Sequence, residues 1–200
     1  MRLFKRKPSR DERLEQLLQA IEAPDLMRVS ALLDRDRDLL AARNAYGVFP
    51  LMYAIFRHQP AAAELLLQQG ADPNAQSRDG GSMLTLATVE GQPATVDALL
   101  AHGANPNYPD RFGATALMYA SQLDEPEVAR RLIGAGADVQ ARDAEGDTVL
   151  MYAVNRENRA LIDLLIEAGA NPMARNFDNQ TAFDKARSQD IIDRLQARRP

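Results

Sequence analysis

Two histidines are the residues of this chain best suited to acid–base or metal chemistry. His58 and His102 each carry an imidazole, which can exchange a proton near neutral pH or bind zinc. Protein zinc sites use three or four ligands, often cysteines, and this chain contains no cysteine. Neither histidine stands in an H-E-x-x-H pattern. We therefore predict two solvated histidines, no metal site and no cofactor.

Other short motifs that carry catalysis are also missing. The sequence contains no G-x-S-x-G nucleophile elbow and no phosphate-binding loop. GAGADV at 134–139 begins like a dinucleotide-binding fingerprint, but it lacks the third glycine and ends an expected helix. NQT at 179–181 matches a glycosylation acceptor, which has no use in the cytoplasm. Because the carboxylates are scattered, we predict that the protein is not an enzyme, and we keep an enzyme or cofactor binder as the weakest alternative.

Charge is divided unevenly along the chain. Residues 1–10 contain five of the 24 Lys and Arg residues and no acid, so the remainder holds 19 basic and 28 acidic residues. We expect this acidic body to repel nucleic acid, whereas the basic start could contact phosphate or an anionic membrane weakly. The favoured interpretation of residues 1–13 is a disordered, solubilising tail.

Composition favours the cytoplasm as the compartment. The chain has no run of 18 apolar residues that would span a membrane, and its start has no apolar core of a secretory signal. The lack of cysteine fits a reducing environment. We therefore predict a cytoplasmic protein.

Glycine spacing indicates what arranges these residues. GADPN at 70–74 returns as GANPN at 103–107, GADVQ at 136–140 and GANPM at 169–173, each 33 residues after the last. A second series with the same period consists of Gly47, Gly80, Gly113 and Gly146, with Asn179 in the fifth place. A fixed period of this length predicts an array of stacked repeat units.

Each unit is predicted to contain two helices and an extended loop. Leu51 and Ala54 lie three positions apart, on one helical face, and the pattern returns at Leu84, Leu117, Leu150 and Phe183 and at Ala87, Ala120, Ala153 and Ala186. The residues placed to cap this first helix through a hydroxyl are Ser82, Thr115, Thr148 and Thr181. A second helix is expected to begin at Pro60, Pro93 and Pro126. It should end at the repeated glycine, where the chain turns left-handed.

These units resemble the ankyrin repeat, whose 33-residue unit starts with Thr-Pro-Leu-His-x-Ala and closes with Gly-Ala-Asp-x-Asn. GATALMYA at 113–120 and GADPNAQ at 70–76 follow that frame closely. The resemblance implies an all-α solenoid of stacked helix-turn-helix units with hairpin-like finger loops, in a single domain over residues 14–200. Its expected units are an N-terminal cap at 14–46, full units at 47–79, 80–112, 113–145 and 146–178, and a truncated C-terminal cap at 179–200. The family is common in bacteria as well as in eukaryotes, and a bacterial source is expected.

One departure from the family frame concerns its histidine, which helps to hydrogen-bond neighbouring loops. Its place is taken by Met52, Thr85, Met118, Met151 and Asp184. We expect methionine packing to replace part of that contribution. Tyrosines recur beside these positions, at Tyr53, Tyr119 and Tyr152. We interpret them as helix packing; the alternative is an aromatic recognition surface.

The resemblance also implies where a partner protein binds: on the concave face, at the fingertips and the exposed turns of the first helices. The fingertip positions are Tyr46, Arg78, Asp79, Arg111, Phe112, Glu145 and Phe177. The first-helix positions are Phe56, Arg57, Glu90, Gln122, Leu123, Asn155 and Arg156. Four of the chain's eleven aromatic residues fall in this set, which favours a binding surface. The alternative is that each aromatic side chain folds back onto its neighbouring finger.

The predicted function is therefore a non-catalytic scaffold for protein–protein interaction, acting as a monomer that binds a partner of unknown identity. The main alternative is an adaptor that its basic N-terminal tail tethers to a membrane or to nucleic acid.

Overall fold

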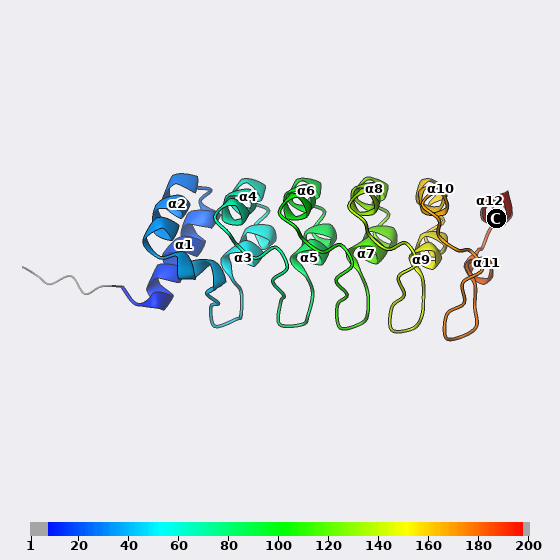
Figure 1. The fold of residues 1–200 in the computed structure, drawn as a ribbon, viewed down its shortest axis with the longest axis horizontal. Helices are drawn as coiled ribbons and strands as arrows, with labels where there is room; N and C mark the ends of the chain where they lie inside the picture. The colour runs from blue at the N-terminus through cyan, green and yellow to red at the C-terminus, as the bar shows by residue number, and fades with distance from the viewer. Residues whose placement is uncertain (1–7, 198–200) are drawn as a thin grey trace, which may run out of the picture.

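The 33-residue period becomes a row of stacked helical pairs in the computed structural model, which describes residues 8–197 (Figure 1). The first helices of the pairs are α1 (Arg10–Glu22), α3 (Pro50–Phe56), α5 (Met83–Val89), α7 (Ala116–Gln122), α9 (Val149–Asn155) and α11 (Ala182–Lys185). The second helices are α2 (Leu26–Arg35), α4 (Pro60–Gln68), α6 (Pro93–Ala101), α8 (Pro126–Gly134), α10 (Arg159–Glu167) and α12 (Gln189–Ala197). A 3-10 helix, η1 (Arg37–Ala41), follows α2.

Finger loops connect each pair to the next and all project to the same side of the row (Figure 1). The described residues contain no β-strand, and two isolated bridges, Gln76 to Ser82 and Arg142 to Thr148, lie at the bases of fingers. The prediction of an all-α solenoid with hairpin-like finger loops is confirmed.

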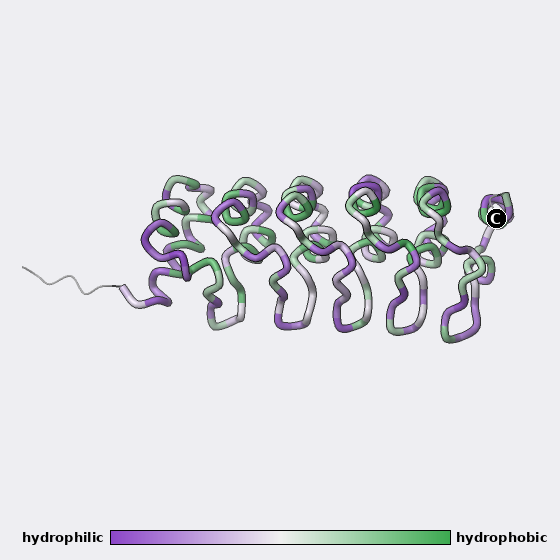
Figure 2. Tube along the Cα trace, in the orientation of Figure 1, coloured by the Kyte–Doolittle hydropathy of each residue, from purple (hydrophilic) through white to green (hydrophobic). Residues whose placement is uncertain are grey.

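Leucine and alanine form the layer in which neighbouring units touch. Leu51 and Ala54 are fully buried, and so are their equivalents in the next three units. Complete burial of a leucine side chain contributes about 1.5–3 kcal/mol, whereas alanine lets the helices approach closely. Figure 2 shows the result: the helices carry most of the hydrophobic residues and the finger loops are largely hydrophilic.

Methionine takes the place of the family histidine in three of the full units, and it packs against the core as expected. Met118 and Met151 are buried in the core, and Met52 is partly buried against it. In the unit 80–112, the Thr85 hydroxyl lies 3.0 Å from the Ser82 hydroxyl, so a polar contact replaces packing there.

The boundaries of the second helices agree with the predicted signals. Pro60, Pro93 and Pro126 are the first residues of α4, α6 and α8. The glycine that follows the helix has a positive φ in each unit, from +87° at Gly103 to +95° at Gly169. A residue with a Cβ would be strained in this left-handed conformation, so the glycine is the stop signal.

Hydroxyl capping of the first helices follows the prediction in part. The Ser82 and Thr148 hydroxyls accept hydrogen bonds from the amides of Thr85 (3.0 Å) and Met151 (3.4 Å). The prediction is wrong for Thr115, whose hydroxyl is buried and makes no hydrogen bond to the amides of α7. The Thr181 hydroxyl donates to the Asp184 carboxylate (2.7 Å).

Side-chain amides tie each helix stop to the next unit. Asn74 donates to the carbonyl of Gly103 (3.1 Å) and accepts from the amide of Asn105 (2.8 Å). Asn107 and Gln140 form the same pair of bonds one and two units later. The repeated phrase GADPN therefore ends a helix and also joins neighbouring units.

The terminal units differ from the full ones. Helix α1 begins at Arg10, four residues before the expected start of the N-terminal unit, because Ser9 and Glu12 form a capping box there. Residues 1–7 of the expected tail lie outside the described residues. In the C-terminal unit α11 spans four residues, against seven in α9. No helix in residues 8–197 is long and apolar enough to cross a membrane.

Candidate functional site

In three of the fingers, one polar side chain at the base of the finger shapes the fingertip. Asp110 Oδ1 accepts hydrogen bonds from the amides of Phe112 (2.8 Å) and Ala114 (3.0 Å). Asn44 and Asp143 make equivalent pairs of bonds in their own fingers. The finger glycines have φ between +75° and +86°, which lets the chain reverse over few residues. This local geometry fixes the backbone from which the fingertip side chains project.

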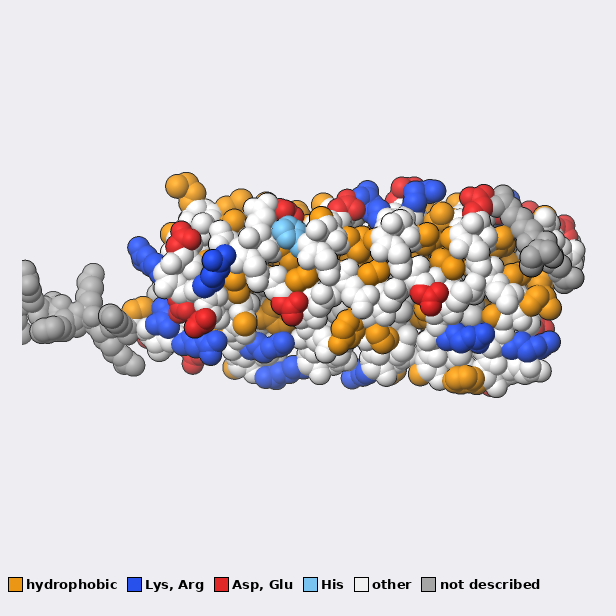
Figure 3. All heavy atoms as spheres, in the orientation of Figure 1, with side chains coloured by type: hydrophobic (Ala, Val, Ile, Leu, Met, Phe, Trp, Pro, Cys, Tyr) orange, Lys and Arg blue, Asp and Glu red, His pale blue; other side chains and the backbone are white. Residues whose placement is uncertain are grey.

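Neighbouring fingers touch through their backbones and form a continuous wall. The Ala144 amide donates to the Phe112 carbonyl (2.8 Å), and the Phe177 amide donates to the Glu145 carbonyl (3.0 Å). Arg78 instead donates to the carbonyl of Ala45 (3.2 Å). Figure 3 shows basic side chains in a row across the finger loops on the face in view.

Two tyrosines connect the fingers to the first helices. The Tyr119 hydroxyl donates to Asp110 Oδ2 (2.7 Å), and the Tyr152 hydroxyl donates to Asp143 Oδ2 (2.6 Å). Burial and the adjacent carboxylate raise the pKa of Tyr119 to about 12 and also raise the pKa of Tyr152. Both side chains are partly buried against the core, which supports the packing interpretation, although their rings also line the surface described next.

A hollow of about 330 Å³ lies between the fingers and the first helices of the central units. Its apolar lining comes from Met52 and Phe56 on α3, Leu86 and Val89 on α5, and Phe112 on a finger. Its polar lining residues are Ser77, Asp79, Ser82, Thr85, Asp110, Arg111 and Tyr119. The Ser77 hydroxyl, which donates to Asp79 Oδ1 (2.5 Å), lowers the pKa of the Asp79 carboxyl.

A second hollow of about 250 Å³ adjoins the first, and Phe112 and Tyr119 line both. The other residues that line it are Ala114, Met118, Gln122, Asp143, Ala144, Glu145 and Tyr152. We call the two hollows together the finger–helix groove. No histidine or lysine lines the groove, and its one arginine, Arg111, lies over the Phe112 ring at 4.6 Å from the centroid.

The structure gathers six of the fourteen predicted site residues around this groove: Phe56, Asp79, Arg111, Phe112, Gln122 and Glu145. Leu123 is an exposed apolar residue at the end of α7. Tyr46 lies apart, at a hollow of the first unit that Asp11, Leu14 and Glu15 also line. Phe177 packs one ring edge toward Gly146 but remains 77% exposed.

Three predicted site residues are engaged within the solenoid. Arg57 pairs with Glu22 of the first unit and lies over the Tyr53 ring. Glu90 faces His58 (3.2 Å), and Arg78 packs against Gly47. Their side chains therefore join units, and a partner would have to displace these contacts. Asn155 is half-buried and Arg156 exposed, and neither lines the groove.

Sequence reasoning missed the floor of the groove, which consists of Met52, Leu86, Ser82, Thr85, Asp110 and Tyr119. The 33-residue period could have identified these positions, because each one recurs at a fixed distance in sequence from the finger glycine. Packing or capping was the favoured interpretation of Met52, Thr85, Ser82 and Tyr119, with a recognition surface as the alternative for Tyr119, and no role was predicted for Asp110. A half-buried position can serve both the core and a surface.

Both histidines are exposed, as predicted, and each also faces a carboxylate. His58 Nε2 lies 3.2 Å from Glu90, and His102 Nε2 lies 3.4 Å from Glu64. Both pairs join the units 47–79 and 80–112, because consecutive units bring these side chains together. Within residues 8–197, no group of three or more His, Cys, Asp or Glu residues could hold a metal ion.

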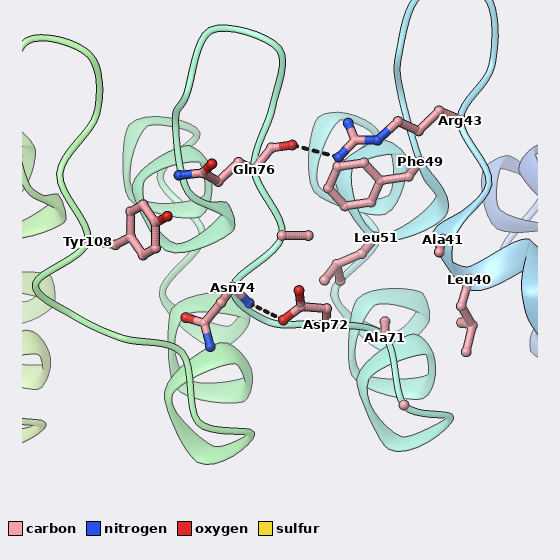
Figure 4. Close-up of a pocket in the computed structure, with 12 residues that line it drawn as sticks. Leu40, Ala41, Arg43, Phe49, Leu51, Ala71, Asp72, Asn74, Gln76 and Tyr108 are labelled. Carbon is pink, nitrogen blue, oxygen red and sulfur yellow. Dashed lines mark hydrogen bonds between the residues drawn. The ribbon is translucent and has the colours of Figure 1, made fainter.

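Another hollow, of about 560 Å³, lies between the first units on a different surface (Figure 4). Arg43 crosses it to the carbonyl of Gln76 (2.9 Å) and stacks over Phe49, while Asp72 accepts from the amide of Asn74 (2.9 Å). Its two charged side chains are therefore already engaged in holding the loop, and we place no functional site there.

Comparison with known proteins agrees with this architecture. A family model described as ankyrin repeats (3 copies) matches residues 62–143, 84–176 and 124–196. An ankyrin repeat domain from Acinetobacter baumannii has a similar structure, with a TM-score of 0.82, 30% identity, and coverage of 90% of this chain and 94% of that one. The 2-5A-dependent ribonuclease of Mus musculus is 30% identical over 74 residues, which are 37% of this chain and a tenth of the ribonuclease. The chain belongs to the ankyrin repeat family.

Proposed function

We propose that this chain is a non-catalytic scaffold that binds a partner protein in the finger–helix groove. Ankyrin repeats are generally protein-interaction modules. The observation that carries the proposal is a set of large apolar side chains exposed around one hollow: Phe56 is 41% exposed, Val89 45% and Phe112 56%.

Exposed apolar residues that adjoin one another favour a partner surface. Covering such a side chain removes apolar area from water, at about 25 cal/mol per Å², and aromatic residues are enriched among those that dominate binding energy. The backbone contacts between fingers hold Phe112 in place before a partner arrives, so little ordering would be needed on binding.

The remaining elements of the proposal come from the sequence. We place the scaffold in the cytoplasm, as a monomer, with no catalytic activity of its own. The tethered adaptor depends on the basic tail at residues 1–13, of which residues 1–7 lie outside the described part of the chain, and it stays a prediction.

Affinity capture with paired variants tests the proposal. The full chain is immobilised, exposed to lysate of its native cells, and the retained proteins are identified by mass spectrometry. We expect a partner retained by the wild type to be lost with Phe56→Ala/Phe112→Ala, because both exposed rings are removed. Met27→Ala is the matched control, since Met27 is exposed on α2, away from the groove.

Thermal melting shows whether the variants are folded. The double variant should melt within a few degrees of the wild type, because both side chains are exposed. A partner that the folded double variant retains at wild-type level would contradict the proposal.

A further inference from the structure

We propose that the finger–helix groove binds a basic peptide segment of the partner, with a Lys or Arg side chain beside Glu145 and an apolar side chain between Phe56 and Phe112. This inference rests on the proposed function and specifies the chemistry of the partner.

Charge around the groove favours a cationic segment. Four carboxylates line the two hollows, at Asp79, Asp110, Asp143 and Glu145, against the single guanidinium of Arg111. Asp110 and Asp143 are held by a tyrosine hydroxyl and by finger amides. The Glu145 carboxylate has no hydrogen bond or ion pair among residues 8–197, so it is free to meet a partner's charge.

The second hollow has the composition of a site for a cation. Phe112, Tyr119 and Tyr152 supply aromatic rings, and Asp143 and Glu145 supply negative charge. A cation is attracted to the face of an aromatic ring and to carboxylates, more strongly when water is excluded. The hollow of about 250 Å³ has room for one Lys or Arg side chain.

The first hollow is suited to an apolar side chain. Met52, Leu86 and Val89 form its apolar lining between the rings of Phe56 and Phe112. Because Phe112 and Tyr119 line both hollows, side chains close together on one segment can occupy the two at once. An acidic segment would be repelled by the four carboxylates, and so would the phosphates of nucleic acid or anionic lipid.

Selection from a random dodecapeptide library displayed on phage tests this chemistry on the folded full chain. We expect the enriched peptides to carry net positive charge, with a Lys or Arg near a large apolar residue. A synthetic copy of an enriched peptide should bind Glu145→Gln about two- to fivefold more weakly, the range expected for losing one exposed ion pair. Glu127→Gln is the matched control, because Glu127 is an exposed carboxylate of α8 outside the groove.

Three outcomes would overturn the inference. One is enrichment of acidic or uncharged peptides, and another is equal binding by wild type and Glu145→Gln. The third is direct binding of anionic phospholipid vesicles or of a DNA oligonucleotide to the full chain, without peptide, that Phe56→Ala/Phe112→Ala abolishes.

Failure of this inference can be separated from failure of the proposed function. If no peptide is enriched but capture from lysate still depends on Phe56 and Phe112, the inference fails and the scaffold function stands.

Discussion

At the scale of single residues, equivalent threonine hydroxyls in two repeat units make different hydrogen bonds. Thr115 and Thr148 lie 33 residues apart and both precede a first helix, with similar backbone angles. The Thr148 hydroxyl caps α9, whereas the Thr115 hydroxyl is buried without a partner. A buried polar group that makes no hydrogen bond costs about 1–3 kcal/mol, so equal sequence does not mean equal contribution.

The first prediction uses this pair. Thr115→Val removes the unpaired hydroxyl and keeps the side-chain shape, so we expect the free energy of unfolding to rise by about 1 kcal/mol. Thr148→Val removes a helix cap, and we expect a loss of about 1 kcal/mol. Urea unfolding of the full chain measures both. Changes of the same sign in the two variants would show that the two hydroxyls have equivalent surroundings.

A second prediction concerns the tyrosine hydroxyls and alkaline pH. The pKa of Tyr119 is raised from 10 to about 12, so the folded state holds its proton more tightly than the unfolded state. This stabilisation is fully present below pH 10 and is lost as pH rises toward 12. The raised pKa of Tyr152 acts in the same direction. We therefore expect the free energy of unfolding to fall above pH 10.

Tyr119→Phe/Tyr152→Phe should make this fall shallower and should also lower stability at pH 7, by about 1 kcal/mol for each hydrogen bond lost. Urea unfolding measured from pH 7 to 11 provides both numbers. Tyr46→Phe is the control, because Tyr46 is exposed at the first fingertip. An unchanged slope in the double variant would mean that these hydroxyls are not responsible.

At the scale of the elements, helices and fingers use glycine for different reasons. Gly103 ends α6 in open space, with no atom within 4 Å of where a Cβ would lie. Gly113 has a similar φ, but a Cβ there would lie 2.9 Å from the amide nitrogen of Ala144 in the next finger. Gly103 is therefore needed to end its own helix, whereas Gly113 also leaves space for the finger of the neighbouring unit.

The third prediction compares Gly103→Ala with Gly113→Ala. Both place a Cβ on a left-handed residue, which costs about 1–2 kcal/mol. Gly113→Ala should cost more than that, because its Cβ meets backbone atoms that cannot rotate away. Urea unfolding gives the two values, and equal losses would show that the fingers move apart without cost.

How far the sequence predicts this structure depends on the range of the interaction. Leu51, Pro60 and Gly70 are set by local rules of helix face, start and stop, so the unit could be predicted from the chain alone. The pairing of Arg57 with Glu22 could not, because it depends on how consecutive units are rotated against each other. The groove could be predicted in part. Phe56 and Phe112 were predicted as binding residues from their place in the unit, whereas the place of Tyr119 in the lining depends on the position of the finger that its hydroxyl contacts.

At the scale of the whole molecule, each unit contacts the units before and after it in the row (Figure 1). In such an array stability is a sum of units and of the interfaces between neighbours. Asn74 is an example: it binds the carbonyl of Gly103, the helix-stop glycine of the next unit, and every full unit has a glycine at this position. Equivalent positions in any two full units should therefore be able to meet.

The fourth prediction is that deleting residues 80–112 leaves a folded, shorter solenoid. The deletion removes one whole period, so Leu51 would meet Leu117 in place of Leu84, and Asn74 would meet the carbonyl of Gly136 in place of that of Gly103. One interface and its burial are lost, and we expect the melting temperature to fall by about 5–10 °C, at about 2–4 °C per kcal/mol. Circular dichroism should keep its helical form, while capture of the partner is lost together with Phe112.

The matched control removes residues 93–112, which contain helix α6 and the finger that follows it. Helix α5 is then followed by α7 with no second helix between them, so consecutive units no longer stack through both of their helices. We expect this variant to lose cooperative melting or to aggregate. If both deletions fold equally well, then stacking does not depend on whole 33-residue units, and if neither folds, then the unit at 80–112 makes contacts that no other full unit can supply.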